Sequence, residues 1–251
     1  MLISRENLVL SDQWVDWKYM EEKKDPIFDQ VIVACERQKI KRIMSYQHDW
    51  NVELIAQFYA IVYFHNSNGE ESRWEMVWMT EGTVYSISYM EFAHLIGKHD
   101  PDFNRPKIHL EQCLPDSEMK FMYPPQNQGY CGQATGLYTF YASLYRMFRK
   151  TLNPRGGDAT NISNYAKNLL AGMRENARPF CLTKFKWEEI KDISYDQYRS
   201  CAYPPIIMRV IERSTWTDFV KIVPHKPLRI KVVKHPIVPS PSVAPSGLVT
   251  P

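Results

Sequence analysis

RWEMVWMTEGTVYSISYMEFAHLIG, residues 73–97, predicts a β-hairpin that leads directly into a helix. Apolar and polar residues alternate on both sides of Glu81-Gly82, and a period of two around a glycine turn is typical of paired strands. Ser88 is followed three positions later by Glu91, the pattern of a capping box, which marks the start of a helix. The sequence therefore predicts one small hairpin near residues 73–88 with a helix behind it.

Helical periodicity dominates the rest of the chain. Apolar residues recur every three or four positions over six further segments, which is typical of amphipathic helices. The segments are residues 25–38, 49–65, 137–150, 160–173 and 187–193, and the stretch that begins at Pro204-Pro205. The expected fold class is α+β, a mainly helical globular domain with one small hairpin.

Length and composition are those of a globular protein. The chain has 251 residues, of which 44% are apolar and 24% are charged, and its 7 Trp, 15 Tyr and 11 Phe supply large side chains for a core. A chain of this length buries roughly three quarters of its unfolded surface. These values exclude disorder for the chain as a whole.

The distribution of prolines and charges predicts the domain organisation. Residues 1–24 are expected to be a flexible lead-in, and residues 25–222 one domain. Five prolines within residues 100–129 indicate an irregular connection, which would divide the domain into subdomains 25–100 and 130–222. Recurrent proline after residue 222 predicts that residues 223–251 form a basic, disordered tail.

Net charge is +3, too small by itself to indicate a nucleic-acid-binding protein. Residues 199–251, however, contain eight Lys or Arg against two acidic residues, a local charge of +6. A second basic segment mixes charges with aromatic rings, the combination that holds single-stranded nucleic acid. The candidate contacts are Lys221, Lys226, Arg229, Lys231 and Lys234 in the tail, and Arg146, Arg149, Lys150 and Arg155 in the second segment.

Known catalytic motifs are missing from the sequence. Residues 126–132 resemble the stretch before the nucleophile of papain-like cysteine proteases, but Ala134 stands where that nucleophile would be. The histidines and cysteines have no metal-ligand spacing, and the glycines match no phosphate-binding loop. We therefore expect no enzyme activity, no metal and no cofactor. Three carboxylates brought together from distant segments remain an open alternative.

Cysteine usage and hydropathy bear on the compartment. The five cysteines form no CxxC pair, which favours reduced thiols inside the cell, in the nucleus or the cytoplasm. No apolar run approaches the ~20 residues of a membrane helix, so no membrane partner is expected.

Short motifs in a fixed order point to a family. They are WNVELIAQFYA (50–60), WMTEG (78–82), FAHLIG (92–97), GYCG (129–132), NPRGGD (153–158), NLL (168–170), WEEI (187–190) and SCAYPP (200–205). In content and order they resemble the plant transposon protein domain, a family of retrotransposon-derived reading frames in grass genomes. The hairpin-to-helix unit is more distantly similar to the plant mobile domain. The resemblance spans residues 48–230 and implies no catalytic residues.

Two classes of function follow as hypotheses. The first is a non-enzymatic, gag-like structural or interaction module of retrotransposon origin, which self-associates through apolar helical faces and contacts RNA or DNA weakly. The alternative is a transposase-like or nuclease-like enzyme with a carboxylate-bound metal. A regulatory domain domesticated by the host is a third hypothesis that the sequence does not separate from the first.

Overall fold

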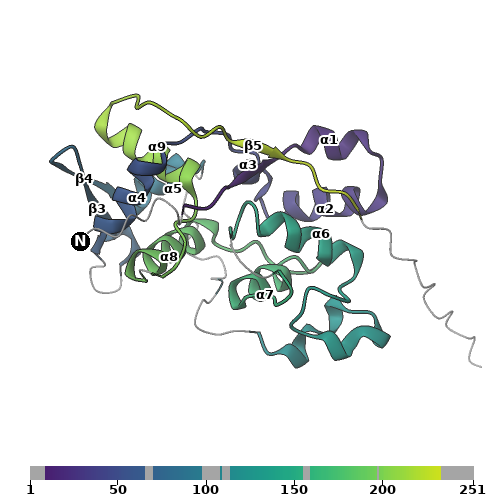
Figure 1. Cartoon of the computed structure of the whole chain (residues 1–251). Helices are drawn as coiled ribbons and strands as arrows, with labels where there is room; N and C mark the ends of the chain where they lie inside the picture. The colour runs from purple at the N-terminus through teal and green to yellow at the C-terminus, as the bar shows by residue number, and fades with distance from the viewer. Residues whose placement is uncertain are drawn as a thin grey trace, which may run out of the picture.

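The structure is a computed structural model that describes residues 9–65, 70–97, 108, 114–154, 159–196 and 198–232. It has an α+β fold with a mainly helical content, as the sequence predicts (Figure 1). The α-helices are α1 (Trp17–Glu22), α2 (Pro26–Arg37), α3 (Lys41–Met44), α4 (Val52–Ile61), α5 (Tyr89–Leu95), α6 (Thr139–Phe148), α7 (Asn164–Ala171), α8 (Leu182–Tyr195) and α9 (Pro204–Thr215). Short 3-10 helices cover Glu71–Arg73, Asp116–Met122 and Pro125–Tyr130. No described helix has the length and apolar character needed to cross a membrane.

Local signals fix several helix ends. Asp25 caps α2 through a 2.9 Å bond from the Ile27 amide, and Pro26 follows at the first helical position. The predicted helix over 49–65 is too long, because α4 begins after the cap residue Asn51 and ends at Ile61. Val62 is already extended, and the next three residues form a strand.

The predicted hairpin is confirmed and belongs to a larger sheet. Strand β3 (Glu75–Thr80) pairs antiparallel with β4 (Thr83–Ser88), and Glu81 and Gly82 take the positive φ angles of a two-residue turn. Both bonds of the capping box at Ser88 and Glu91 are present. The sequence did not predict β2 (Tyr63–His65), which pairs with β3 to give the order β2-β3-β4.

A second sheet corrects the expectation for the two ends of the domain. Strand β1 (Gln13–Val15) pairs parallel with β5 (Lys226–Leu228), so the expected flexible lead-in and the start of the expected disordered tail are part of the fold. Figure 1 shows this yellow segment crossing the molecule from α9 toward α1. Its prolines suit an extended edge strand, where a missing N–H costs little. Ile230 is buried in the core beyond β5.

Two hydrophobic cores cut across the subdomains predicted at 25–100 and 130–222. The first core contains α1 and α2 together with α6, α7 and the start of α8. The second contains α4, the three-stranded sheet and α5 together with the rest of α8 and α9. Each core therefore joins segments from both sides of residues 100–129. Helix α8 connects them, because Phe185 is buried in the first core and Trp187 in the second.

Two charged side chains of α8 are buried at the junction of the cores. Lys186 and Glu189 are both fully buried. The Lys186 ammonium donates to the Leu152 carbonyl oxygen at 2.7 Å and lies 3.5 Å from the centroid of the Tyr203 ring. The Tyr203 hydroxyl is shared between that carbonyl and the Glu189 carboxylate. Buried charges require such partners, and here they tie α8 to the start of α9 and to the turn that follows α6.

Candidate nucleic-acid interface

A cleft lies where α6, two loops and the segment after α9 meet. Its volume is about 670 Å³. The lining residues come from the loop before α6, from α6 and the turn after it, and from the loop before α7. The end of β5 and Ile230 complete the lining. Three of the predicted contacts, Arg146, Arg149 and Lys150, are among them.

The sequence of α6 explains why these cations reach the cleft. Leu144 and Phe148 are fully buried in the first core, so Arg146 lies on the exposed side of α6, and Lys150 is exposed in the turn that follows the helix. Arg149 is half-buried and donates from Nη1 to the Tyr145 hydroxyl at 3.3 Å. Two exposed cations four residues apart can contact adjacent phosphates of a nucleic-acid backbone.

Tyr145 holds the loop that forms the opposite wall. Its hydroxyl is directed at the carbonyl oxygens of Asn161 at 3.0 Å and Ala159 at 3.3 Å. The described lining contains no Asp or Glu, so no carboxylate there competes with an anionic ligand. The described part of the cleft thus combines basic groups with a fixed backbone wall.

The segment after α9 contributes apolar groups to the same cleft. Leu228 and Ile230 line it, whereas Arg229 between them pairs with Asp16 at 3.4 Å and lies 5.4 Å from the centroid of the Tyr19 ring. Successive side chains of an extended segment point to opposite sides, so Leu228 and Ile230 face the cleft and Arg229 faces away from it.

The other predicted contacts fall in different places. Lys226 and Lys231 are exposed on and beyond β5. Lys221 does not join the cleft, because its ammonium pairs with Glu212 at 2.8 Å and with Asp218, and these bonds raise the pKa of Lys221. Arg155 and Lys234 lie outside the described residues.

The enzymatic alternative required acidic side chains gathered in one place. Among the described residues, no group of three or more His, Cys, Asp or Glu is arranged to hold a metal ion. The described cysteines at positions 35, 131, 181 and 201 are free thiols, and Cys35 and Cys201 are fully buried. Burial raises the pKa of the Cys35 thiol far above its ordinary value, which suppresses the reactive thiolate.

A second basic surface was missed by the sequence analysis. Arg209 and Arg213 lie on one exposed side of α9, and Trp216 follows at the helix end. The signal was present as a four-residue spacing between two arginines in a helix that the sequence did predict.

Comparison with known proteins adds no relative: the chain matches no protein-family model, no curated protein and no solved structure.

Proposed function

We propose that this protein is a non-enzymatic module that binds single-stranded RNA or DNA through the cleft beside α6. The observation that carries the proposal is the convergence of Arg146, Arg149 and Lys150 in one cleft whose described lining has no carboxylate. Phosphate contacts supply most of the affinity of binding that is independent of sequence, and they make that affinity strongly dependent on salt.

The resemblance to the plant transposon protein domain supports a gag-like role of retrotransposon origin for this module. A protein of that kind needs contact with a nucleic-acid backbone more than recognition of one sequence. The basic cleft fits that requirement, because charges directed at phosphates carry no sequence information.

The salt dependence of binding tests the proposal. The variant is Arg146→Ala with Lys150→Ala, both on exposed residues, and the probe is a fluorescently labelled oligothymidylate. Each phosphate contact to a single strand contributes about −0.7 to the slope of log K against log salt concentration, so we expect the variant's slope to be less steep by about 1.4. Fluorescence anisotropy over a series of NaCl concentrations measures both affinity and slope.

A matched control removes two exposed cations elsewhere. Arg73→Ala with Lys120→Ala changes the net charge equally at residues that are not in the described lining of the cleft. This control should bind like wild type. If the affinity of the wild type were independent of salt, or if both double variants lost the same amount of affinity, the cleft would be rejected as the binding site.

Self-association remains a second part of the proposal, but its surface changes. The apolar helical faces expected to mediate it are packed inside the two cores. The outer face of the three-stranded sheet instead exposes Tyr63, Met79 and Val84, and Met79 and Val84 pair across the hairpin. Exposed apolar groups gathered on one sheet face favour contact between copies.

Light scattering after size exclusion tests this surface. We expect Met79→Lys with Val84→Lys to lower the average mass at high protein concentration, because charges on the face oppose its burial. Val33→Lys, which changes an exposed apolar residue of α2, is the control and should leave the mass unchanged. A wild-type mass equal to one chain at every concentration would refute self-association.

A further inference from the structure

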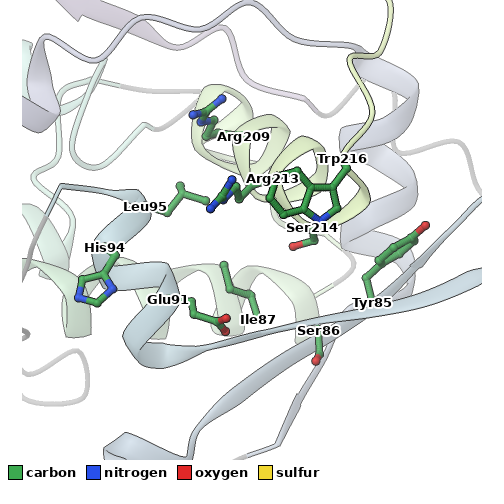
Figure 2. A pocket seen from close by; sticks show the side chains of 10 residues that line it. All are labelled: Tyr85, Ser86, Ile87, Glu91, His94, Leu95, Arg209, Arg213, Ser214 and Trp216. Atoms are coloured by element: carbon green, nitrogen blue, oxygen red, sulfur yellow. The ribbon is translucent and has the colours of Figure 1, made fainter.

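A second cavity of about 590 Å³ lies between β4, α5 and the end of α9. Figure 2 shows Trp216 and Tyr85 at one end of this cavity, Arg213 beside the indole and His94 at the other end. None of these residues belongs to the described lining of the cleft beside α6. The cavity therefore has to be explained by its own chemistry.

Two guanidinium groups give the cavity a positive charge. Arg209 and Arg213 are exposed and one helical turn apart on α9, and none of the described salt bridges includes either residue. Glu212, the acidic residue between them, is directed elsewhere and pairs with His48 and Lys221. Paired guanidinium groups without a carboxylate partner are suited to binding phosphate.

The one carboxylate in the described lining is already bonded. Glu91 accepts bonds from the Ser88 hydroxyl at 2.7 Å and the Ser88 amide at 2.9 Å, as part of the capping box. These bonds hold the pKa of Glu91 below its ordinary value. Its role at the start of α5 accounts for its presence in the cavity wall without any ion pair to the arginines.

Trp216 supplies an exposed aromatic surface. The residue is 80% exposed, and its backbone has the left-handed φ of +56° that disfavours bulky residues. One side of the indole faces the Arg213 guanidinium, 4.6 Å from the ring centroid. The chain thus holds a large ring in solvent at a cost to its stability, with a cation beside it.

The cavity continues as a groove. A neighbouring hollow of about 240 Å³ shares Leu95 and Arg209 with this cavity. A further hollow of about 320 Å³ shares Arg42 and Gly97 with that neighbouring hollow. A Cβ at Gly97 would lie 3.1 Å from the Arg42 guanidinium carbon, so the glycine leaves room for this third arginine. We call the three connected hollows the α9 groove.

We infer that the α9 groove binds a segment of single-stranded nucleic acid, with one unpaired base stacked on Trp216 and successive phosphates on Arg213, Arg209 and Arg42. Stacking on an aromatic ring beside a positively charged groove is how proteins hold single strands without reading their sequence. A groove that runs past the first cavity fits a polymer better than a free nucleotide. The inference rests on the proposed function for the nature of the ligand, but it adds base contacts at residues that the first site does not use.

The experiment compares a strand with bases to one without them. The probes are labelled oligothymidylate and an abasic deoxyribose-phosphate strand of equal length. We expect wild type to prefer the strand with bases by about tenfold. Trp216→Leu should lose most of that preference and keep its affinity for the abasic strand. Arg209→Ala with Arg213→Ala should weaken binding of both strands.

Tyr198→Leu is the matched control, because it changes an aromatic residue that is 85% exposed and is absent from the described lining of the groove. It should keep the preference of wild type. Equal binding of the two strands by wild type, or an unchanged preference in Trp216→Leu, overturns the inference. So does thymidine monophosphate binding as tightly as the strand, or an acidic peptide that displaces the strand at lower concentration than unlabelled oligothymidylate does.

The two sites fail in different ways. The less steep salt dependence expected of Arg146→Ala with Lys150→Ala concerns contacts with the backbone alone and affects both probes equally. Loss of the preference for bases in Trp216→Leu concerns the α9 groove alone. Either result is obtained with the full chain, and neither depends on the other.

Discussion

Asp12 and Lys186 show what burial does to individual charges in this protein. Lys186 is fully buried and Asp12 nearly so, and burial is the largest influence on each. Desolvation raises the pKa of Asp12 to about 8, against the attraction of Lys186, and lowers the pKa of Lys186 to about 7, against the attraction of Glu189 and Asp12. These shifts make the stability of the protein depend on pH.

We expect Asp12→Asn to gain stability relative to wild type as pH rises from about 4 to about 8. In this range the native carboxyl keeps a proton that the unfolded chain has released, so the wild type's free energy of unfolding falls with pH. The amide does not titrate, and its oxygen can still accept the 2.8 Å bond from the Gln13 N–H. Urea denaturation of both proteins at pH 5 and pH 8 measures the change.

Lys186 has the opposite effect at higher pH. Its native pKa is lowered, so above about pH 7 and up to about 10.5 the unfolded chain binds a proton that the native state lacks, and the wild type gains stability with pH. Lys186→Met should remove this alkaline rise and leave the fall between about pH 4 and about pH 8. If the difference in free energy of unfolding between Asp12→Asn and wild type were the same at pH 5 and at pH 8, this account of Asp12 would be contradicted.

The burial of Lys186 could not be predicted from its neighbours. In Lys184-Phe185-Lys186-Trp187, charges alternate with aromatic residues, the usual pattern of core rings separated by solvated charges. Lys184 follows the pattern in part, since it pairs with Glu188 at 2.8 Å near the surface. Lys186 departs from it because the aromatic residues on its two sides belong to different cores, which places Lys186 between them.

Among the elements, the hairpin was the most predictable because all its signals are local. The turn glycine, the alternation and the capping box lie within residues 73–97. Strands β1, β2 and β5 have three residues each and depend on partners, which lie more than 200 residues away in the case of β1 and β5. Such strands have no period of their own, so their existence follows from tertiary packing.

The turn of the hairpin is not optimal, and this gives a prediction for the element. Glu81 has a φ of +50°, which costs an ordinary L-residue about 1–2 kcal/mol. Asn tolerates this conformation, and Asn-Gly is the favoured pair in such turns, so we expect Glu81→Asn to stabilise the protein by about 0.5–1 kcal/mol. Thermal and urea denaturation measure the gain. Glu81→Ala, which lacks the short polar side chain that favours Asn in this conformation, should show no such gain; equal stabilisation by both would contradict the explanation.

At the scale of the whole molecule, the last described segment holds the fold together. The His225 amide donates to Asp49 at 2.8 Å, the Trp14 indole donates to the His225 carbonyl at 3.1 Å, and Ile230 is buried in the first core. Composition alone indicated disorder here, because proline-rich sequence is common in both extended linkers and edge strands.

Truncation tests that role. A chain ending at Val223 loses β5 and the contacts of Ile230, and we expect its free energy of unfolding to fall by at least about 2 kcal/mol, the order of one buried aliphatic side chain. A chain ending at Val232 keeps every contact described here and serves as the control. Equal stability of the two chains, measured by urea denaturation, would contradict the packing of this segment.

The candidate interface was predicted in part. The helix predicted over residues 137–150 is present as α6, but it ends at Phe148, before Arg149 and Lys150; the basic character of both segments was recognisable from the sequence. The contact between the two segments was not predictable, because it depends on the parallel pairing of β1 with β5, which brings Leu228 and Ile230 to α6. Lys221 was predicted to contact nucleic acid because Glu212 and Asp218 entered only the net charge of the segment. The sequence did not show that both carboxylates pair with the Lys221 ammonium.

The pairing of β1 with β5 also governs the timing of folding during synthesis. The Trp14 indole and the His225 carbonyl that it meets are 211 positions apart, so the first strand has no partner until those further residues have been synthesised. At about 5–20 residues per second, this interval is about 10–40 seconds. Throughout it, the first core lacks Ile230 and β1 has an open edge, the kind of surface that chaperones cover on a nascent chain.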